Sequence, residues 1–312
     1  MMTWFLLTLG LLLAPVAFSA EPKQETREVS NLELLPSALH REALLEDMPF
    51  SSVSLTETGE AWLAGKHNLW KWNPAIGSLK KMEIPSEGLA RVISLTAGSA
   101  VFQTLKKVYM VWDQPVSIKE IYSGSRVALD LTSQGSLAIG SKQSFLISKE
   151  LHSKTSMSLD LADCEGISLG ENGQVFCRIK GEIFLASKEQ AKMKLILKTK
   201  SEIKAFKALG DSLVVVSDRA VWAIGTDGSL LKTVTPQSGK KIAASYLDNH
   251  THAFLFNDKL FEVNQIEEKT KITTWLSAPG TKVVDDLSYR NARIGLILDG
   301  FPYIFQLEQI RK

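Results

Sequence analysis

The side chains that could carry chemistry in this chain are few and far apart. No phosphate-cradling glycine loop, no Gly-x-Ser-x-Gly elbow and no His-Glu-x-x-His pattern occurs. The five histidines are His40, His67, His152, His250 and His252. Only the last two are neighbours, and they lack nearby cysteines or suitably spaced carboxylates, so a polar turn is favoured over a metal site. The sequence therefore predicts no catalytic residue, no metal and no cofactor.

Cys164 and Cys177 are the two cysteines of the chain. Two cysteines without adjacent histidines do not supply the four ligands of a structural zinc site. A disulfide is permitted if the protein is exported, and two buried thiols are the alternative. We name the pair as a disulfide candidate.

The first 20 residues, MMTWFLLTLGLLLAPVAFSA, have the pattern of a signal peptide. The apolar run from Trp4 to Ala17 is shorter than the about 20 residues that span a bilayer, and Ala17 and Ser19 suit a signal peptidase. We expect a periplasmic or secreted protein with no transmembrane segment in the mature chain. An uncleaved N-terminal anchor is the alternative, because no Lys or Arg precedes the apolar run.

Composition alone singles out no partner. The chain has 312 residues, of which 45% are hydrophobic and 22% charged, and the net charge is +2. These values are ordinary for a globular protein, so the positions of the charges must carry the information.

The chain repeats itself with a period of about 40 residues, each unit holding four short β-runs, which is typical of a propeller blade. The second run of each unit is almost continuously apolar, as expected for a strand buried on both faces. We predict an all-β fold, a seven-bladed β-propeller over residues 49–312, with six or eight blades and a pair of β-sandwiches as alternatives. The blades are expected to start near residues 49, 89, 126, 164, 202, 241 and 282.

The seventh unit lacks an outer strand, and a surplus β-run precedes the first unit. Residues 28–35 are therefore expected to pair beside the third strand of the last blade and close the ring, which removes exposed sheet edges. Within the N-terminal segment 21–48, the stretch Ser37–Met48 has helix-like apolar spacing and predicts a short connecting helix.

The stretch from Gly59 to Gly77, GEAWLAGKHNLWKWNPAIG, resembles the repeat of two-component-regulator-type (WD40/PQQ-like) propellers. That repeat has Trp-x-Gly followed by Gly-Leu-x-Arg-Tyr-Asp-Pro and Gly. The resemblance covers one unit well and leaves traces elsewhere, so it implies the architecture and no activity. Trp62, Trp70 and Trp72 are interpreted mainly as packing residues between blades, with an exposed aromatic surface as the alternative.

Propeller enzymes often place acidic residues on the innermost strands, around the central channel. The candidates here are Asp130, Glu165, Glu202, Asp285 and Asp286, with Arg126, Lys204 and Lys207 as counter-ions. We interpret them chiefly as ion pairs rather than as a catalytic set.

Basic residues recur at the tight turn between the second and third runs of six units. Because these turns open on one face of a propeller, they could form a basic face that attracts an anionic partner, with solubility as the alternative. The predicted partner-binding residues are Lys66, His67, Lys106, Lys107, Lys142, Lys180, Arg219 and Lys259.

The sequence as a whole favours a non-enzymatic binding or scaffold module of the cell envelope. Its expected partner is another envelope protein or an anionic envelope component, and not nucleic acid. A propeller hydrolase or lyase acting at the channel mouth and an extracytoplasmic sensor subunit are the alternatives.

Overall fold

The computed structural model describes most of the chain after the predicted signal peptide, which lies outside the described residues. The described ranges are 23–26, 31–34, 38–84, 91–104, 106–124, 127–132, 135–148, 153–170, 173–186, 193–210, 212–235, 241–247, 253–256, 259–264, 271–277 and 284–307.

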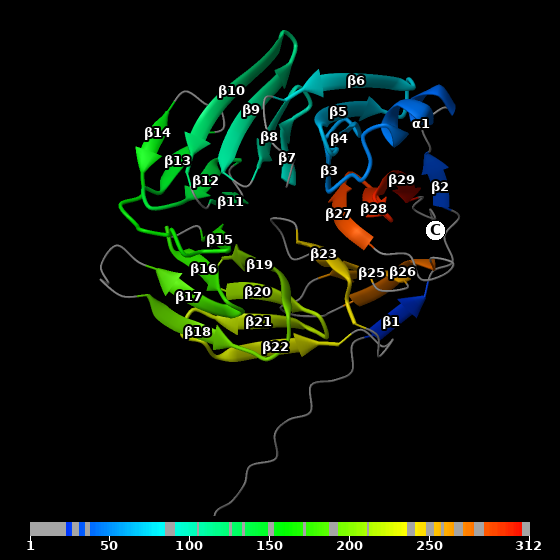
Figure 1. Ribbon diagram of the computed structural model, residues 1–312. Helices are drawn as coiled ribbons and strands as arrows, with labels where there is room; N and C mark the ends of the chain where they lie inside the picture. The colour runs from blue at the N-terminus through cyan, green and yellow to red at the C-terminus, as the bar shows by residue number, and fades with distance from the viewer. Residues whose placement is uncertain are drawn as a thin grey trace, which may run out of the picture.

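The described strands form seven separate sheets arranged as a β-propeller (Figure 1), and every strand pairing but one is antiparallel. The first sheet contains β3 (Ser52–Leu55), β4 (Ala61–Ala64), β5 (Asn68–Asn73) and β6 (Ser78–Glu83). The second contains β7 (Arg91–Thr96), β8 (Ser99–Gln103), β9 (Lys107–Asp113) and β10 (Val116–Ser123). The third contains β11 (Ala128–Leu131), β12 (Leu137–Gly140), β13 (Phe145–Ile147) and β14 (Lys154–Ser156).

The remaining four sheets continue around the ring. The fourth contains β15 (Gly166–Leu169), β16 (Val175–Ile179), β17 (Glu182–Ala186) and β18 (Lys194–Lys198). The fifth contains β19 (Ile203–Leu209), β20 (Ser212–Ser217), β21 (Val221–Gly225) and β22 (Leu230–Val234). The sixth contains β23 (Ala244–Leu247), β24 (Ala253–Phe256), β25 (Lys259–Asn264) and β26 (Lys271–Ser277), and the seventh contains β27 (Val284–Arg290), β28 (Arg293–Leu298) and β29 (Phe301–Leu307).

The core of the protein lies between the sheets. Seven clusters of buried apolar residues each join two neighbouring sheets, and the last of them joins Ile297 and Ile304 of the seventh sheet to Val53 and Leu63 of the first. The apolar second strands with described side chains are largely buried, and β4, β12 and β20 are buried along their whole length. Burial on both faces explains why these strands show no alternation of polar and apolar residues.

The three tryptophans of the first sheet are packing residues, as predicted. Trp62, Trp70 and Trp72 are 0%, 6% and 1% exposed. Trp62 contributes to the cluster between the first and second sheets, and Trp70 and Trp72 contribute to the cluster between the seventh and first. Burial of such large side chains anchors both neighbours of this sheet.

The N-terminal segment supplies two strands. β2 (Asn31–Leu34) pairs antiparallel with β29 and takes the outer place in the seventh sheet, the pairing expected for residues 28–35. β1 (Lys23–Thr26) pairs parallel with β26 and adds a fifth strand to the sixth sheet, which was not expected. The N-terminal segment therefore covers the outer edges of two sheets.

The predicted connecting helix is α1 (Ala38–Leu45). Its Leu44 is fully buried in the cluster between the seventh and first sheets. Among the described residues, no helix is long and apolar enough to cross a membrane.

Removing β2 tests the closure of the ring. A chain that lacks every residue up to 34 leaves the outer edge of β29 unpaired, and unpaired edges promote association with other chains. We expect its Tm to fall by at least about 5 °C and oligomers to appear in size-exclusion chromatography. The control lacks only residues up to 26, so it keeps β2, and it should stay closer to the full chain. Equal behaviour of the two truncations would contradict a closing role for β2.

Candidate functional site: the central channel and the basic turns

The first strands of the sheets surround a central cavity of about 380 Å³. These inner strands run parallel to one another around the ring. Hydrogen bonds show which inner strands are neighbours. Ser52 and Ser54 of β3, for example, accept from the backbone of Val92 and Ser94 of β7, at 3.2 and 2.8 Å. We call the end at which the inner strands begin the channel mouth.

Each inner strand has one edge that is not paired within its own sheet. At four junctions between described inner strands, side-chain oxygens from the preceding sheet accept hydrogen bonds from backbone N–H groups along that edge. Asp286 and Ser288 of β27 accept from Val53 and Leu55 of β3 in this way, at 2.8 and 3.1 Å. Asp130 of β11 accepts from Leu169, and Ser168 of β15 accepts from Ala208, both at 2.9 Å.

Lys207 and Asp130 form a buried ion pair inside the channel. The Lys207 Nζ lies 2.6 Å from Oδ1 of Asp130, and each side chain is 10% exposed. Lys207 also donates to the carbonyl oxygen of Leu131 at 2.5 Å, while Asp130 Oδ2 accepts from the backbone of Leu169. These contacts agree with the interpretation of the channel carboxylates as ion-pairing groups.

Asp286 is a half-buried residue that lines the cavity. Burial raises the pKa of this carboxyl group, while hydrogen bonds from the Val53 N–H and the Ser52 hydroxyl and the positive charge of Arg91 partly oppose the shift. Ser52 Oγ donates to Asp286 Oδ2 at 2.7 Å. The acidic side chain thus lies where it links the seventh sheet to the first.

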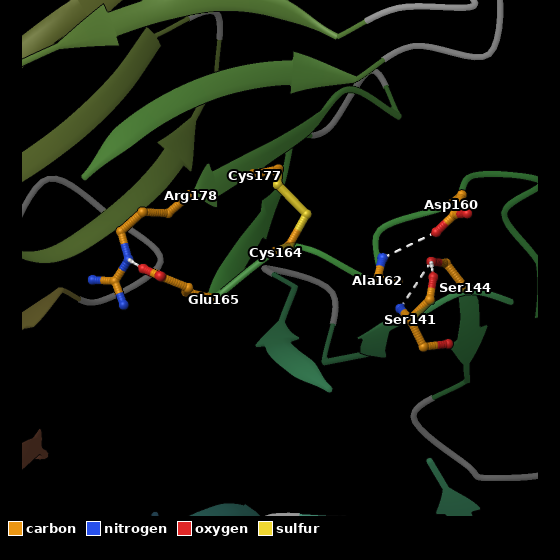
Figure 2. Close-up of a disulfide and its surroundings, with 8 residues drawn as sticks. All are labelled: Ser141, Ser144, Asp160, Ala162, Cys164, Glu165, Cys177 and Arg178. Carbon is orange, nitrogen blue, oxygen red and sulfur yellow. Dashed lines mark hydrogen bonds and ion pairs between the residues drawn. A yellow bond between two sulfur atoms is a disulfide. The ribbon is translucent and has the colours of Figure 1, made fainter. Parts of the chain in front are cut away.

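Cys164 and Cys177 are joined by a disulfide, one of the two alternatives that the sequence left open (Figure 2). The bond ties the start of β15 to β16. The next residues along the chain, Glu165 and Arg178, lie beside it and form an ion pair of 3.6 Å. Arg178 stands opposite Gly166 in the strand register and donates to the carbonyl oxygen of Ile203 at 2.9 Å. The disulfide therefore anchors the backbone that carries an ion pair at the channel mouth.

The channel brings together only part of the predicted acidic set. Asp130, Glu165 and Asp286 line the cavity together with Lys204 and Lys207. Glu202 pairs with Lys204 at 2.8 Å outside the lining, and Asp285 accepts from the Gly300 backbone at 2.9 Å. Arg126 lies outside the described residues.

Sequence reasoning missed three cations that line the channel, Arg91, Arg178 and Arg290. Arg91 is the first residue of an inner strand, so its position in the repeat was a usable signal. Arg178 belongs to a second strand, and it reaches the channel opposite a glycine, which the pattern of apolar residues did not reveal. Within the described residues, no group of three or more His, Cys, Asp or Glu side chains is arranged to hold a metal ion.

The turns between second and third strands lie on the same face as the channel mouth. Because the inner strands run parallel and each sheet is antiparallel, equivalent turns open in the same direction. Backbone hydrogen bonds join these turns to the connections between sheets, for example from Ile242 to Asp218 and from Leu161 to Ser141, both 2.8 Å. A set of equivalent turns therefore surrounds the mouth.

Six of the predicted basic residues are exposed at these turns and form no ion pair with another described residue. They are Lys66, His67, Lys106, Lys142, Lys180 and Arg219. We call the turns that carry these residues the basic turns. Many cations elsewhere are paired. Lys71, for example, contacts Asp113 at 2.6 Å and Glu60 at 3.0 Å. Burial opposes the charge of Lys71, but these two carboxylates outweigh it and raise its pKa.

Two predicted basic residues differ from the rest. Lys107 is the first residue of β9, and its ammonium group lies 2.8 Å from Glu120, so its charge is neutralised locally. Lys259 is the first residue of β25, and its side chain is not among those described.

The first basic turn is held by a buried carboxylate that sequence reasoning did not identify. Asp47 is 2% exposed and accepts from the backbone of His67 at 2.7 Å and of Asn68 at 3.1 Å. It also accepts from Trp70 Nε1 at 2.6 Å. These bonds satisfy the Trp70 indole inside the core and fix the turn that presents Lys66.

Comparison with known proteins supports the fold. No protein-family model matches the sequence, and no curated protein matches it. By structure, the chain resembles a catalytically inactive variant of virginiamycin B lyase from Staphylococcus aureus with quinupristin, with a TM-score of 0.65, 12% identity and coverage of 90% of this chain and 100% of the lyase. A selenomethionine-substituted form of that lyase has a TM-score of 0.64 and 11% identity, over 90% of this chain and 99% of the other.

A chain of the mitotic checkpoint complex is also similar, with a TM-score of 0.62, 14% identity and coverage of 99% of this chain and 98% of the other. An enzyme and a member of a protein assembly therefore share this architecture. At such low identities the similarity shows the fold alone, because one fold hosts many functions. The chain is a β-propeller.

The Lys207–Asp130 pair is expected to matter for stability. Lys207→Met leaves a buried carboxylate without its counter-ion, so the free energy of unfolding should fall by about 3 kcal/mol, measured by urea denaturation. The matched control is Lys204→Met, whose partner Glu202 has a side chain 67% exposed; its loss should stay below about 1 kcal/mol. Equal losses would show that the buried pair has no special role.

Asp286 should make stability depend on pH in an unusual direction. Because its pKa is raised in the folded protein, the folded state holds this proton more tightly than the unfolded state. Its contribution is therefore largest below the ordinary carboxyl pKa of 3.8 and is lost as the pH rises through the raised value. Asp286→Asn should become more stable relative to the original chain between about pH 4 and 8, measured by urea denaturation. A constant difference would contradict the assignment.

Proposed function

We propose that this protein is a non-enzymatic propeller, with all seven sheets serving as blades of one closed ring, that binds an anionic partner through its basic turns. The observation that carries the proposal is the contrast in charge pairing. Channel cations such as Lys207 have carboxylate partners, whereas the six basic turn residues are exposed without one among the described residues. Exposed charges of one sign on one face attract partners of opposite charge.

The rigid ring supports a binding role. Residues on loops become effective binding groups when a scaffold holds them in place. Here the backbone of the first basic turn is fixed by Asp47, and the turns that carry Lys106, Lys142 and Arg219 are hydrogen-bonded to the connections between sheets. The backbone that carries the basic residues is therefore ordered before binding, so binding a partner costs less conformational entropy.

The charges of the opposite face are partly neutralised. Glu57 pairs with Arg290, and Asp113 pairs with Lys71. Exposed lysines also occur on outer strands, for example Lys119 and Lys194, so the basic turns are distinguished by their common position around the channel mouth.

An enzymatic role receives less support from the channel. Asp130 and Asp286 hold backbone N–H groups of neighbouring sheets, so neither carboxylate is free of a structural task. Of the described histidines, neither His40 nor His67 lines the cavity.

An envelope location fits the disulfide and the N-terminal sequence. Disulfides persist in oxidising compartments such as the periplasm or the cell exterior, and Cys164 and Cys177 are bonded. We therefore propose an exported protein whose partner is an acidic envelope protein or another anionic envelope component.

Charge reversal tests the basic turns. Lys66→Glu with Lys142→Glu should abolish most capture of the partner when the mature protein is used as bait in an envelope extract, with captured components identified by mass spectrometry. The control Lys119→Glu with Lys194→Glu changes the net charge equally at exposed positions on outer strands. Capture by the original chain should also weaken between about 50 and 300 mM salt. Unchanged capture by the turn variant would refute the proposed surface.

A further inference from the structure

The channel mouth contains cationic groups that the fold does not fully use. Arg91 is the first residue of β7, Lys204 the second of β19, and Arg178 lies opposite the first residue of β15. All three line the central cavity, and their places in the strands put them at its mouth. At the far end of the inner strands, by contrast, Lys207 and Arg290 are paired with Asp130 and Glu57.

Each of the three mouth cations keeps hydrogen-bonding capacity. Arg91 is exposed, and its side chain forms no hydrogen bond with another described residue. The Arg178 Nε is buried without a hydrogen-bond partner, because Glu165 approaches it only to 3.6 Å. Lys204 contacts Glu202, whose side chain is 67% exposed, so solvent screens that pair and a ligand can compete with it.

A second unsatisfied group lies in the same cavity. Ser245 Oγ on β23 is buried and has no hydrogen-bond partner. Buried polar atoms are normally satisfied by protein, water or ligand. Arg178 Nε and Ser245 Oγ, in two residues that line this cavity, are therefore available to donate to a bound acceptor.

We propose that the channel mouth binds a small molecule carrying a carboxylate or phosphate group, held by Arg91, Arg178 and Lys204 with Ser245 as an additional donor. Guanidinium groups form paired hydrogen bonds with such oxyanions. The cavity volume of about 380 Å³ is in the range of small-molecule sites. The Cys164–Cys177 disulfide holds the segment that carries Arg178, so the site is largely formed before binding.

The acidic residues in the lining do not cancel this charge. Glu165 forms only a long ion pair with Arg178, at 3.6 Å. Asp286 accepts hydrogen bonds from Ser52 and Val53, which direct its carboxyl group toward the first sheet. Burial also favours the neutral form of Asp286 by raising its pKa. Three cations therefore face three carboxylates, of which Glu202 is exposed and Asp286 is directed toward the first sheet.

Isothermal titration calorimetry of the mature protein at low salt, with inorganic phosphate and with citrate as separate probes, tests the site. We expect saturable one-to-one binding of at least one probe, and Arg91→Ala and Lys204→Ala should each weaken it about tenfold by removing a charge-assisted hydrogen bond. Binding of phosphate alone would indicate a phosphorylated ligand, and binding of citrate alone a carboxylate.

Two controls separate this site from the basic turns, on which it does not depend. Lys142→Ala and Lys119→Ala each remove one exposed lysine outside the cavity and should leave the affinity within about twofold, within the noise of neutral surface changes. Arg91 and Lys204 lie at the surface end of their strands, so thermal melts of their variants should match that of the original chain. No saturable binding of either probe, or equal weakening by Lys142→Ala, would overturn the proposal.

Discussion

The unpaired edge of each inner strand is the constraint on which this propeller depends. A strand that begins a sheet at the channel has N–H groups with no partner in its own sheet, and buried unpaired N–H groups are costly. The chain meets the need with side-chain oxygens from the preceding sheet, such as Ser52, Ser168 and Asp286. These bonds set the register between sheets, so they also decide which side chains reach the channel.

This constraint divides the charged residues of the channel into two groups. Asp130 and Asp286 are occupied in joining sheets, and Lys207 neutralises the first of them. Arg91, Arg178 and Lys204 lie nearer the mouth, where Glu165 approaches Arg178 only to 3.6 Å and Glu202, the partner of Lys204, is exposed. The far end of the channel is thus a polar extension of the core, and the cations at the mouth keep hydrogen-bonding capacity that the fold does not use.

Local devices then shape the face around the mouth. Asp47 links α1 to the first basic turn through His67, Asn68 and Trp70, and the disulfide fixes the start of the fourth sheet. Both devices act on backbone near the mouth rather than on the outer strands. A face with fixed turns and exposed cations spread around the ring fits the binding role proposed above.

The sequence by itself determined the repeat, the strand content and the role of the tryptophans, because these depend on local periodicity and on the burial that a propeller imposes at each position of the unit. It also placed basic residues at equivalent turns. Lys107 shows where that reasoning stopped, since its neutralisation by Glu120 depends on a pairing between β9 and β10 that a list of turn residues does not contain.

Only the tertiary structure decided which polar residues are engaged in hydrogen bonds and ion pairs within the protein. Lys207 and Asp130 belong to sheets that are not consecutive in the chain, and their contact depends on how the sheets are arranged around the channel. The same holds for β1 beside β26. Such contacts join residues far apart in sequence, and no local pattern of residue types encodes the distance between them.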